Sequence, residues 1–244
     1  MKAAILCTDY GGRTLSLTAN KPKALLPVRG RPIIEFIVRK VQLLEEVDKI
    51  FIVTNHRFYS EFKKWQENFF SKKPIDLIDS NTDGLGNNSG VIKWLVFLIE
   101  KGKIDDDLIV IDGNNLFDFD LSAFIKFAKG EYSKNVVGVY NLNGKFKSNR
   151  FDIVKLDDKK RIVDFLKNSP RGNSLKFVST CICFFPKEKL FLFKEYINKR
   201  GEAEKIDSYL EWLIKKDEVF GFEFHGNWIN VRDLDSYTEA IFIF

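Results

Sequence analysis

The residues best suited to chemistry lie in a loop that follows the first apolar run of the chain. Residues 3–7 are apolar and predict a buried strand, and the segment after them contains Gly11, Gly12 and Arg13. Adjacent glycines let backbone N–H groups approach phosphate oxygens, and Arg13 and Lys23 would supply the positive charge that a polyphosphate requires. These residue types predict a phosphate-binding loop, although a glycine pair with two cations is also compatible with an ordinary surface loop.

Strand and helix patterns alternate through the first half of the chain. Residues 50–53 and 108–111 are continuous runs rich in β-branched side chains, which are typical of strands covered on both faces. Residues 32–44 and 91–99 have the apolar spacing of helices. This alternation predicts an α/β fold with a Rossmann-like, doubly wound sheet. Because ligands of such sheets bind beyond the carboxyl ends of the strands, the glycine-containing loop is in a suitable place for a site.

The second half predicts further strands and a closing set of helices. Strands are expected at residues 136–140, 151–156, 161–166 and 177–185, with a hairpin turn at 157–160. Helices are expected at about 186–198 and 203–215, strands near 218–224 and 227–231, and a final helix from Asp233. No repeat, low-complexity segment or linker divides the chain, so we expect one mixed α/β domain.

Charge and cysteine content narrow the classes of function. The 39 basic and 34 acidic residues are interleaved, so the formal charge of +5 hints at anionic ligands and argues against nucleic acid as a partner. Cys7, Cys181 and Cys183 are too few for a disulfide framework and lack the pattern of a metal-binding set. The first apolar run is too short for a signal peptide or a membrane span, so we expect a cytoplasmic protein without a membrane partner.

The wider pattern resembles the sugar-1-phosphate nucleotidylyltransferase family. That family's signature is a glycine–x–glycine–x–arginine loop, then proline–lysine–x–leucine–x–proline–valine and a glycine–x–proline helix start. The positions in register are Gly11, Arg13, Leu17, Thr18, Pro22, Lys23, Leu25, Pro27, Val28, Gly30, Pro32 and Ile33. Later blocks follow in the family's order at residues 112–117, 161–165 and 228–231, with Tyr237 and Ala240 in the final helix.

The resemblance implies a fold, a reaction and a set of site residues. It implies a mixed sheet of the nucleotide-diphospho-sugar transferase type over residues 1–244, with a nucleotide-binding half at 1–130 and a sugar-phosphate half at 131–244. The family transfers a nucleotidyl group from an NTP to a sugar 1-phosphate and releases pyrophosphate. The resemblance gives Arg13 and Lys23 the catalytic role of holding the phosphates, and relatives are often oligomers, so a homo-oligomer or a paralogous subunit is an expected partner.

Further residues are expected around the nucleotide. Gly11, Gly12 and Asp112 belong to the two loops that the resemblance places at the phosphates. Asn87 and Asn88 lie in a glycine-bounded segment that the resemblance places beside the base. That segment is equally suited to cap the helix that follows it, with Asn88 or Ser89 as the capping residue.

The two positions where the family binds Mg²⁺ through aspartate are asparagines here. They are Asn114 and Asn230, and an amide oxygen can ligate the ion but brings no charge. Two unit charges about 4 Å apart interact by roughly 4 kcal/mol at an effective dielectric of 20, so we expect Mg²⁺ binding to be severely weakened. Asparagine is also common in turns after strands, which offers a plainer explanation for both positions.

Other positions of this sequence also differ from the family pattern. Family glycines are replaced by Asp9, Asp152 and Cys181, and the glutamate and lysine of a later block are replaced by Lys167 and Asn168. These departures leave two hypotheses: an active nucleotidylyltransferase with a rearranged site, in which Asp112, Asp118 or Asp9 holds the metal, and a catalytically impaired homologue that binds nucleotides or nucleotide sugars as a regulatory subunit.

A third hypothesis is a dinucleotide-binding oxidoreductase, suggested only by the glycines after the first strand. The three-glycine fingerprint of that class is absent, and residues 53–55 at the end of the second strand contain no acidic residue. Both departures argue against it.

Overall fold

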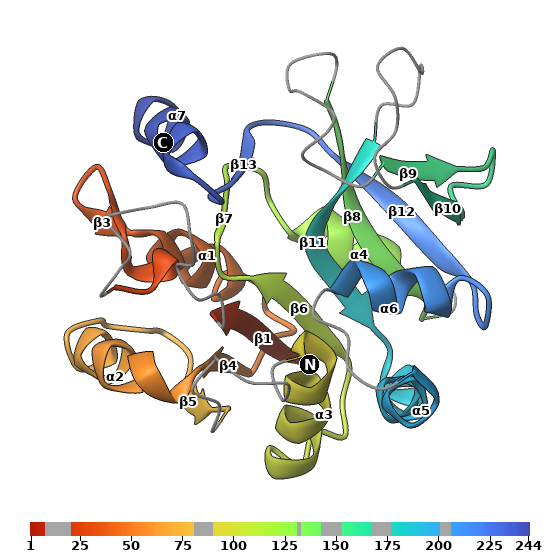
Figure 1. The fold of residues 1–244 in the computed structure, drawn as a ribbon, viewed down its shortest axis with the longest axis horizontal. Coiled ribbons are helices and arrows are strands. Elements are labelled where there is room, and N and C mark those ends of the chain that lie inside the picture. The colour runs from red at the N-terminus through yellow and green to blue at the C-terminus, as the bar shows by residue number, and fades with distance from the viewer. Residues whose placement is uncertain (8–20, 81–89, 131–132, 143–152, 167–176, 201–205) are drawn as a thin grey trace.

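The computed structural model describes residues 1–7, 21–80, 90–130, 133–142, 153–166, 177–200 and 206–244. Within these residues the chain forms a central mixed sheet between layers of helices (Figure 1). The strands of this sheet are β1 (Lys2–Cys7), β4 (Lys49–Thr54), β5 (Ile75–Asp79), β6 (Leu108–Asp112), β8 (Asn135–Asn141), β9 (Ile153–Leu156), β10 (Ile162–Leu166), β11 (Phe177–Phe185) and β12 (Val219–Phe224). The predicted α/β fold with a Rossmann-like sheet is confirmed.

The two halves of the sheet differ in strand direction. β6, β1, β4 and β5 are parallel neighbours, with Ile5 of β1 opposite both Ile52 and Ile111. β11 then pairs antiparallel with β6 and also with β8 and β9, while β12 runs parallel to β8. Among the parallel strands the chain passes from β1 outward to β4 and β5 and returns to β6 on the other side of β1, so the strand order reverses between β1 and β6.

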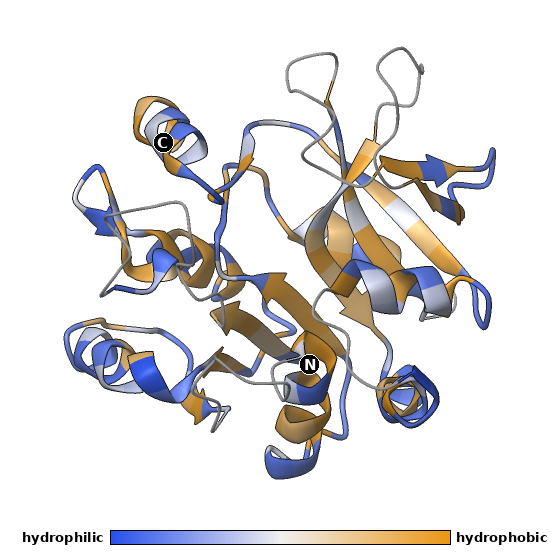
Figure 2. Ribbon diagram, viewed as in Figure 1, coloured by the Kyte–Doolittle hydropathy of each residue, from blue (hydrophilic) through white to orange (hydrophobic). Residues whose placement is uncertain are grey.

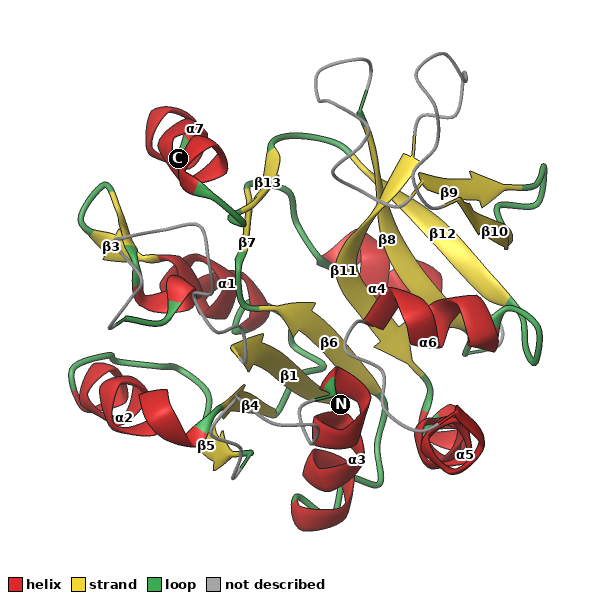
Figure 3. Cartoon of the chain, in the orientation of Figure 1, coloured by secondary structure: helices red, strands yellow, loops and turns green. Residues whose placement is uncertain are grey.

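Helices cover both faces of the sheet, as Figure 3 shows. They are α1 (Ile33–Val41), α2 (Tyr59–Glu67), α3 (Val91–Lys101), α4 (Ser122–Lys129), α5 (Phe191–Arg200), α6 (Ile206–Leu213) and α7 (Leu234–Ile243). One buried cluster joins the sheet to α1, α2 and α4, and a second joins its other face to α3, α5 and α6. The apolar strands in the middle of Figure 2 are therefore covered on both sides, which explains their continuous apolar sequences.

Most predicted elements are present with shifted ends. The first predicted helix ends at Val41 rather than Leu44, and Pro32 precedes it as the N-cap instead of lying in its first turn. The helix predicted from about residue 186 is divided into a 3-10 turn at Lys187–Lys189 and α5. The predicted turn at 157–160 joins β9 to β10, and the carboxylate of Asp157 accepts from the backbone N–H groups of Lys159 and Arg161.

Several elements were not predicted from the sequence, among them α2, β5 and α4. The nine residues of α2 bury only Phe62 and Trp65. β5 is an edge strand that contains two aspartates and buries only Ile78. α4 is a single short helix of eight residues after a polar turn. None of the described helices is long and apolar enough to cross a membrane.

A small ribbon beside the main sheet holds the last part of the chain. β7 (Asn115–Phe117) pairs antiparallel with β13 (Trp228–Asn230), so that Asn115 lies opposite Asn230. A third buried cluster joins this ribbon to α7 and to the hairpin of β2 (Pro27–Val28) and β3 (Arg31–Pro32). The ribbon thus brings residues from the middle of the chain and from its C-terminal part together at the carboxyl edge of the sheet.

Two buried tyrosines allow a test of this packing. The hydroxyl of Tyr209 lies in the α5–α6 core without a hydrogen-bond partner among the described residues, and burial raises its pKa. The hydroxyl of Tyr237 donates to Pro27 O at 2.6 Å. An unpaired buried polar atom costs about 1–3 kcal/mol, so Tyr209→Phe is expected to raise the free energy of unfolding and Tyr237→Phe to lower it by about 1 kcal/mol. Urea denaturation measures both, and a loss of stability in Tyr209→Phe equal to that in Tyr237→Phe would contradict this packing.

Candidate functional site

The carboxyl ends of β1 and β6 are held close together by the turn that follows β6. The backbone N–H of Gly113 donates to Leu6 O at 2.9 Å. A Cβ atom on residue 113 would lie 2.5 Å from Cys7 Sγ, so only glycine fits this close approach without a shift. Burial raises the pKa of Cys7, and the nearby charge of Asp112 raises it further. The turn therefore fixes Asp112 and Asn114 at the edge of the sheet beside β1.

Asp112, Asn114 and Asn230 meet at this edge, although Asn230 comes from the other end of the chain. The Asp112 carboxylate accepts from the backbone N–H of Asn114 at 2.9 Å through Oδ1 and from Asn230 Nδ2 at 3.0 Å through Oδ2. Both asparagines are buried, at 7% and 5% exposure. The structure thus brings the two predicted metal positions and a predicted nucleotide-binding residue into one cluster.

Hydrogen bonds around Asn115 determine how the Asn230 amide is turned. Trp228 Nε1, which can only donate, donates to Asn115 Oδ1 at 3.0 Å, and Asn115 Nδ2 donates to Thr180 O at 2.8 Å. Asn230 Nδ2 then donates to the same Asn115 Oδ1 at 3.2 Å. Because an amide flip would place acceptor against acceptor, these contacts fix the nitrogen of Asn230 toward Asp112 and Asn115. Asn115 is fully buried, and its role was not predicted from the sequence.

The oxygen of the Asn230 amide faces an arginine that the sequence analysis did not single out. Arg232 Nε donates to Asn230 Oδ1 at 3.0 Å. Lys23, which is 6% exposed, donates through Nζ to the backbone oxygen of Arg232 at 3.1 Å. Lys23 reaches this position because the 3-10 turn Lys23–Leu25 packs against α1 behind the ribbon. The predicted catalytic lysine therefore lies at the same edge as the cluster around Asp112.

Cys181 stands where the resemblance implies a glycine, and its backbone keeps a conformation that favours glycine. Its φ is +55°, within a bulge where the register between β11 and β8 shifts. Burial is the main cause that raises its pKa, followed by the charges of Asp207 and Asp112, while Arg232 acts in the opposite direction. Cys181 therefore keeps a glycine-like backbone at the bulge of β11.

The described residues do not fit a Mg²⁺ ion in the way that the resemblance implies. The ion requires oxygen ligands, with one or two carboxylates among them. The single carboxylate of the cluster accepts from two protein donors, and the amide oxygen of Asn230 faces a guanidinium. A doubly charged ion about 4 Å from that guanidinium would be repelled by roughly 8 kcal/mol at an effective dielectric of 20. Among the residues described, no three acidic, histidine or cysteine side chains are grouped to hold a metal.

Asp118, one of the alternative metal carboxylates, accepts its hydrogen bonds from Asn227. Its Oδ1 accepts from the backbone N–H of Asn227 at 2.8 Å, and its Oδ2 accepts from Asn227 Nδ2 at 2.7 Å. It therefore fixes the turn between β12 and β13. The structure assigns it no place beside Asp112.

Several predicted residues lie outside the part of the chain that the structure describes. These are Asp9, Gly11, Gly12, Arg13, Asn87, Asn88, Asp152, Lys167 and Asn168. The helix after the asparagine-containing segment begins at Val91 with Gly90 as its N-cap residue and without a side-chain cap. The roles of the predicted residues outside the described part of the chain therefore stay predictions.

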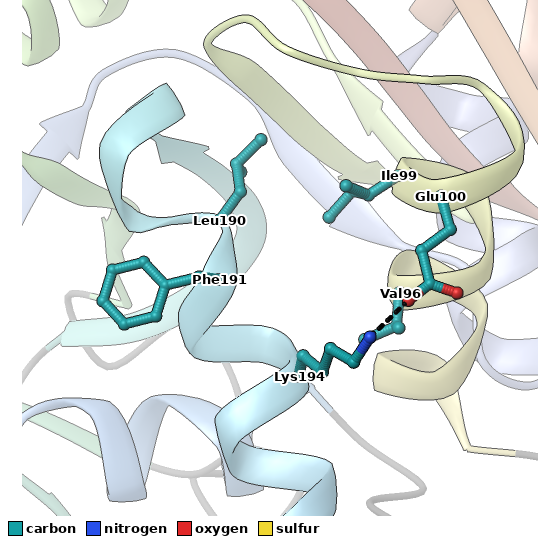
Figure 4. Close-up of a pocket in the computed structure, with 6 residues that line it drawn as sticks. All are labelled: Val96, Ile99, Glu100, Leu190, Phe191 and Lys194. Carbon is teal, nitrogen blue, oxygen red and sulfur yellow. Dashed lines mark hydrogen bonds and ion pairs between the residues drawn. The ribbon is translucent and has the colours of Figure 1, made fainter.

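A small apolar pocket of about 110 Å³ lies at the opposite edge of the sheet (Figure 4). It is formed where the end of α3 meets the start of α5, and Lys194 Nζ and Glu100 Oε1 form an ion pair of 3.0 Å across its rim. Since α3 runs from the carboxyl edge back to the amino edge, this pocket is remote from Asp112. It offers no group of polar side chains for chemistry.

Comparison with known proteins assigns the family. The model of the nucleotidyl transferase family matches residues 2–242, and the chain belongs to this family. The bifunctional protein GlmU of Methanocaldococcus jannaschii is 31% identical over 234 residues, which are 95% of this chain and 51% of that protein. The chain therefore spans about half the length of this relative, and the sugar-1-phosphate nucleotidylyltransferase resemblance is confirmed at the level of the family.

Solved structures show the same fold. The inositol-1-phosphate CTP transferase of T. maritima has a TM-score of 0.76 at 17% identity, and the match covers 98% of this chain and 94% of that one. A UDP-glucose pyrophosphorylase in complex with UDP-glucose has a TM-score of 0.79 at 15% identity, covering 98% and 96%. At these identities the likeness establishes the fold alone.

The close approach at Gly113 gives a test of how the site is positioned. Gly113→Ala is expected to lower the free energy of unfolding by about 1–3 kcal/mol, because its Cβ would overlap Cys7 Sγ. In a Cys7→Ala background the loss is expected to be smaller by about 1 kcal/mol or more, since the overlapping sulfur is gone. Chemical denaturation of the two single variants and the double variant measures this coupling. If the losses in the free energy of unfolding of the two single variants simply add up in the double variant, residue 113 makes no tight steric contact with Cys7.

Proposed function

We propose that this domain binds an NTP and a sugar 1-phosphate at the carboxyl edge of the sheet and transfers the nucleotidyl group between them. The observation that supports this most directly is the meeting of Lys23 with Asp112, Asn114 and Asn230 at that edge. Family membership over residues 2–242 supports the same reaction class. In this proposal residues 1–130 form the nucleotide-binding half and residues 131–244 the sugar-phosphate half.

The proposed reaction requires positioning and positive charge rather than a general base. A phosphate oxygen of the sugar 1-phosphate attacks the α-phosphorus, the bond from that phosphorus to the bridging oxygen breaks, and pyrophosphate leaves with the bonding electrons. The attacking oxygen is already ionised near neutral pH, because the second pKa of a phosphate monoester is about 6. Arg13 and Lys23 would stabilise the charge on the phosphates.

The remaining predicted residues would hold the nucleotide in place. Backbone N–H groups of Gly11 and Gly12 would contact the phosphates, and Asn87 and Asn88 would lie beside the base. Asp112 would organise the turn that brings Asn114 to the edge, since its carboxylate accepts from the Asn114 backbone.

A second candidate is a homologue that binds nucleotides or nucleotide sugars without turnover and serves as a regulatory subunit. The observation that favours it is the arrangement at Asn230, whose amide oxygen faces Arg232 instead of an open ligand position. This arrangement keeps charged side chains at the site, but the two carboxylates that the resemblance implies at positions 114 and 230 are absent.

Pyrophosphate release separates the two candidates. A panel of NTPs and sugar 1-phosphates is incubated with the full chain in EDTA, in Mg²⁺ and in Mn²⁺, with Lys23→Ala as the comparison. Turnover by at least one pairing, reduced about 100-fold or more in Lys23→Ala, is the result expected of a transferase. Nucleotide binding without pyrophosphate release under any condition would favour the second candidate. Absence of nucleotide binding altogether would exclude both.

A carboxylate at each asparagine tests the metal positions. Asn114→Asp/Asn230→Asp would place like charges beside Asp112, so we expect a lower melting temperature than that of the wild-type protein in EDTA and its recovery in Mn²⁺. Asn114→Ala/Asn230→Ala is the matched control, which removes the amides without adding charge and is expected not to respond to Mn²⁺. If the wild-type protein responds to Mn²⁺ as strongly as the aspartate variant, the metal is held by other residues.

A further inference from the structure

If the domain binds the substrates of the proposed function, on which this inference rests, the carboxyl edge of the sheet must neutralise the negative charge of their phosphates. An NTP, a sugar 1-phosphate and pyrophosphate all bring several negative charges, and relatives neutralise part of this charge with a divalent cation. In the described part of this chain both oxygens of the Asp112 carboxylate and the amide oxygen of Asn230 accept hydrogen bonds from protein groups. Protein side chains at this edge are therefore the candidates to supply positive charge for the phosphates.

Arg232 is fixed at this edge by both its backbone and its side chain. Its backbone N–H donates to Ser236 Oγ at 3.0 Å, within the capping box that starts α7. Its Nε donates to Asn230 Oδ1 at 3.0 Å. Since a flip of the Asn230 amide would place acceptor against acceptor, its oxygen stays turned toward the guanidinium and keeps this hydrogen bond available to Arg232.

The Asn230 amide stands between the guanidinium and the carboxylate. Asp112 contacts the nitrogen end of this amide and Arg232 contacts its oxygen end. A contact through an amide orders both charged groups, and it places the guanidinium beside Asn230, a position where the resemblance implies a metal ligand.

Lys23 adds a second cation next to Arg232. Its ammonium donates to the backbone oxygen of Arg232 at 3.1 Å and is almost fully buried. Arg232 and Lys23 are thus two neighbouring cations at a half-buried edge, an arrangement that favours an anionic ligand. Arginine is especially suited to phosphate, because its planar fork matches two phosphate oxygens.

We propose that the guanidinium of Arg232, held by Asn230 and assisted by Lys23, takes the place of the divalent cation and binds a phosphate group of the ligand. Phosphate binding at this site is then independent of divalent cations. The amide of Asn230 is a positioning group for the arginine and not a metal ligand.

Calorimetric titration with inorganic pyrophosphate tests this directly, because pyrophosphate requires no choice of base or sugar. The wild-type protein is expected to bind pyrophosphate at least as tightly in EDTA as in Mg²⁺. Arg232→Gln is expected to weaken binding about tenfold or more in both buffers. Arg39→Gln is the matched control, since Arg39 is a half-exposed arginine on α1 whose partner is Glu35, and its affinity is expected to equal that of the wild-type protein.

A second variant protects the test against loss of folding. Arg232→Lys keeps the positive charge but loses the fork, so we expect weakening that is smaller than in Arg232→Gln, with melting temperatures recorded for each variant. Wild-type binding that requires Mg²⁺, or equal affinity in wild type and both Arg232 variants, would overturn the proposal. Absence of pyrophosphate binding would also overturn it, and the NTP panel then decides separately whether the proposed function survives.

Discussion

The arrangement of the site depends on one constraint: the buried amides at the edge of the sheet must each satisfy their hydrogen bonds. Asn115 and Asn230 are at most 5% exposed, and an unpaired buried polar atom costs about 1–3 kcal/mol. Trp228 can only donate, so it sets the orientation of Asn115, which in turn sets that of Asn230. The pairing of β7 with β13 places these side chains opposite each other and thereby joins the middle of the chain and its C-terminal part at one site.

The same constraint distributes charge across the edge. Because the nitrogen of Asn230 must face Asp112, its oxygen must face the other way, toward Arg232. An aspartate at position 230 would have two acceptor oxygens and could not donate to Asp112. The amide therefore lets a carboxylate and a guanidinium approach the same residue from opposite sides. Where the resemblance implies carboxylates around a cation, the structure has an amide between a carboxylate and a guanidinium.

The sequence predicted the fold, and the resemblance implied that Asn114 and Asn230 share a site, but neither predicted the hydrogen-bond network around these residues. Continuous apolar runs predicted β4 and β6, and the ordered motif blocks predicted that Asn114 and Asn230 share a site. α2 and β5 were missed because polar side chains interrupt their apolar periods. The role of Arg232 could not be predicted, since it follows from the orientation of an amide that is set by residues more than a hundred positions away.

The most direct test of an arginine in place of the cation is a crystal structure with pyrophosphate and Mn²⁺, recorded at the manganese absorption edge. A fixed guanidinium predicts pyrophosphate oxygens within hydrogen-bond distance of Arg232 and no anomalous peak between Asp112 and Asn230. An anomalous peak within about 2.5 Å of Asn230 Oδ1, with Arg232 turned away from the phosphate, would contradict it.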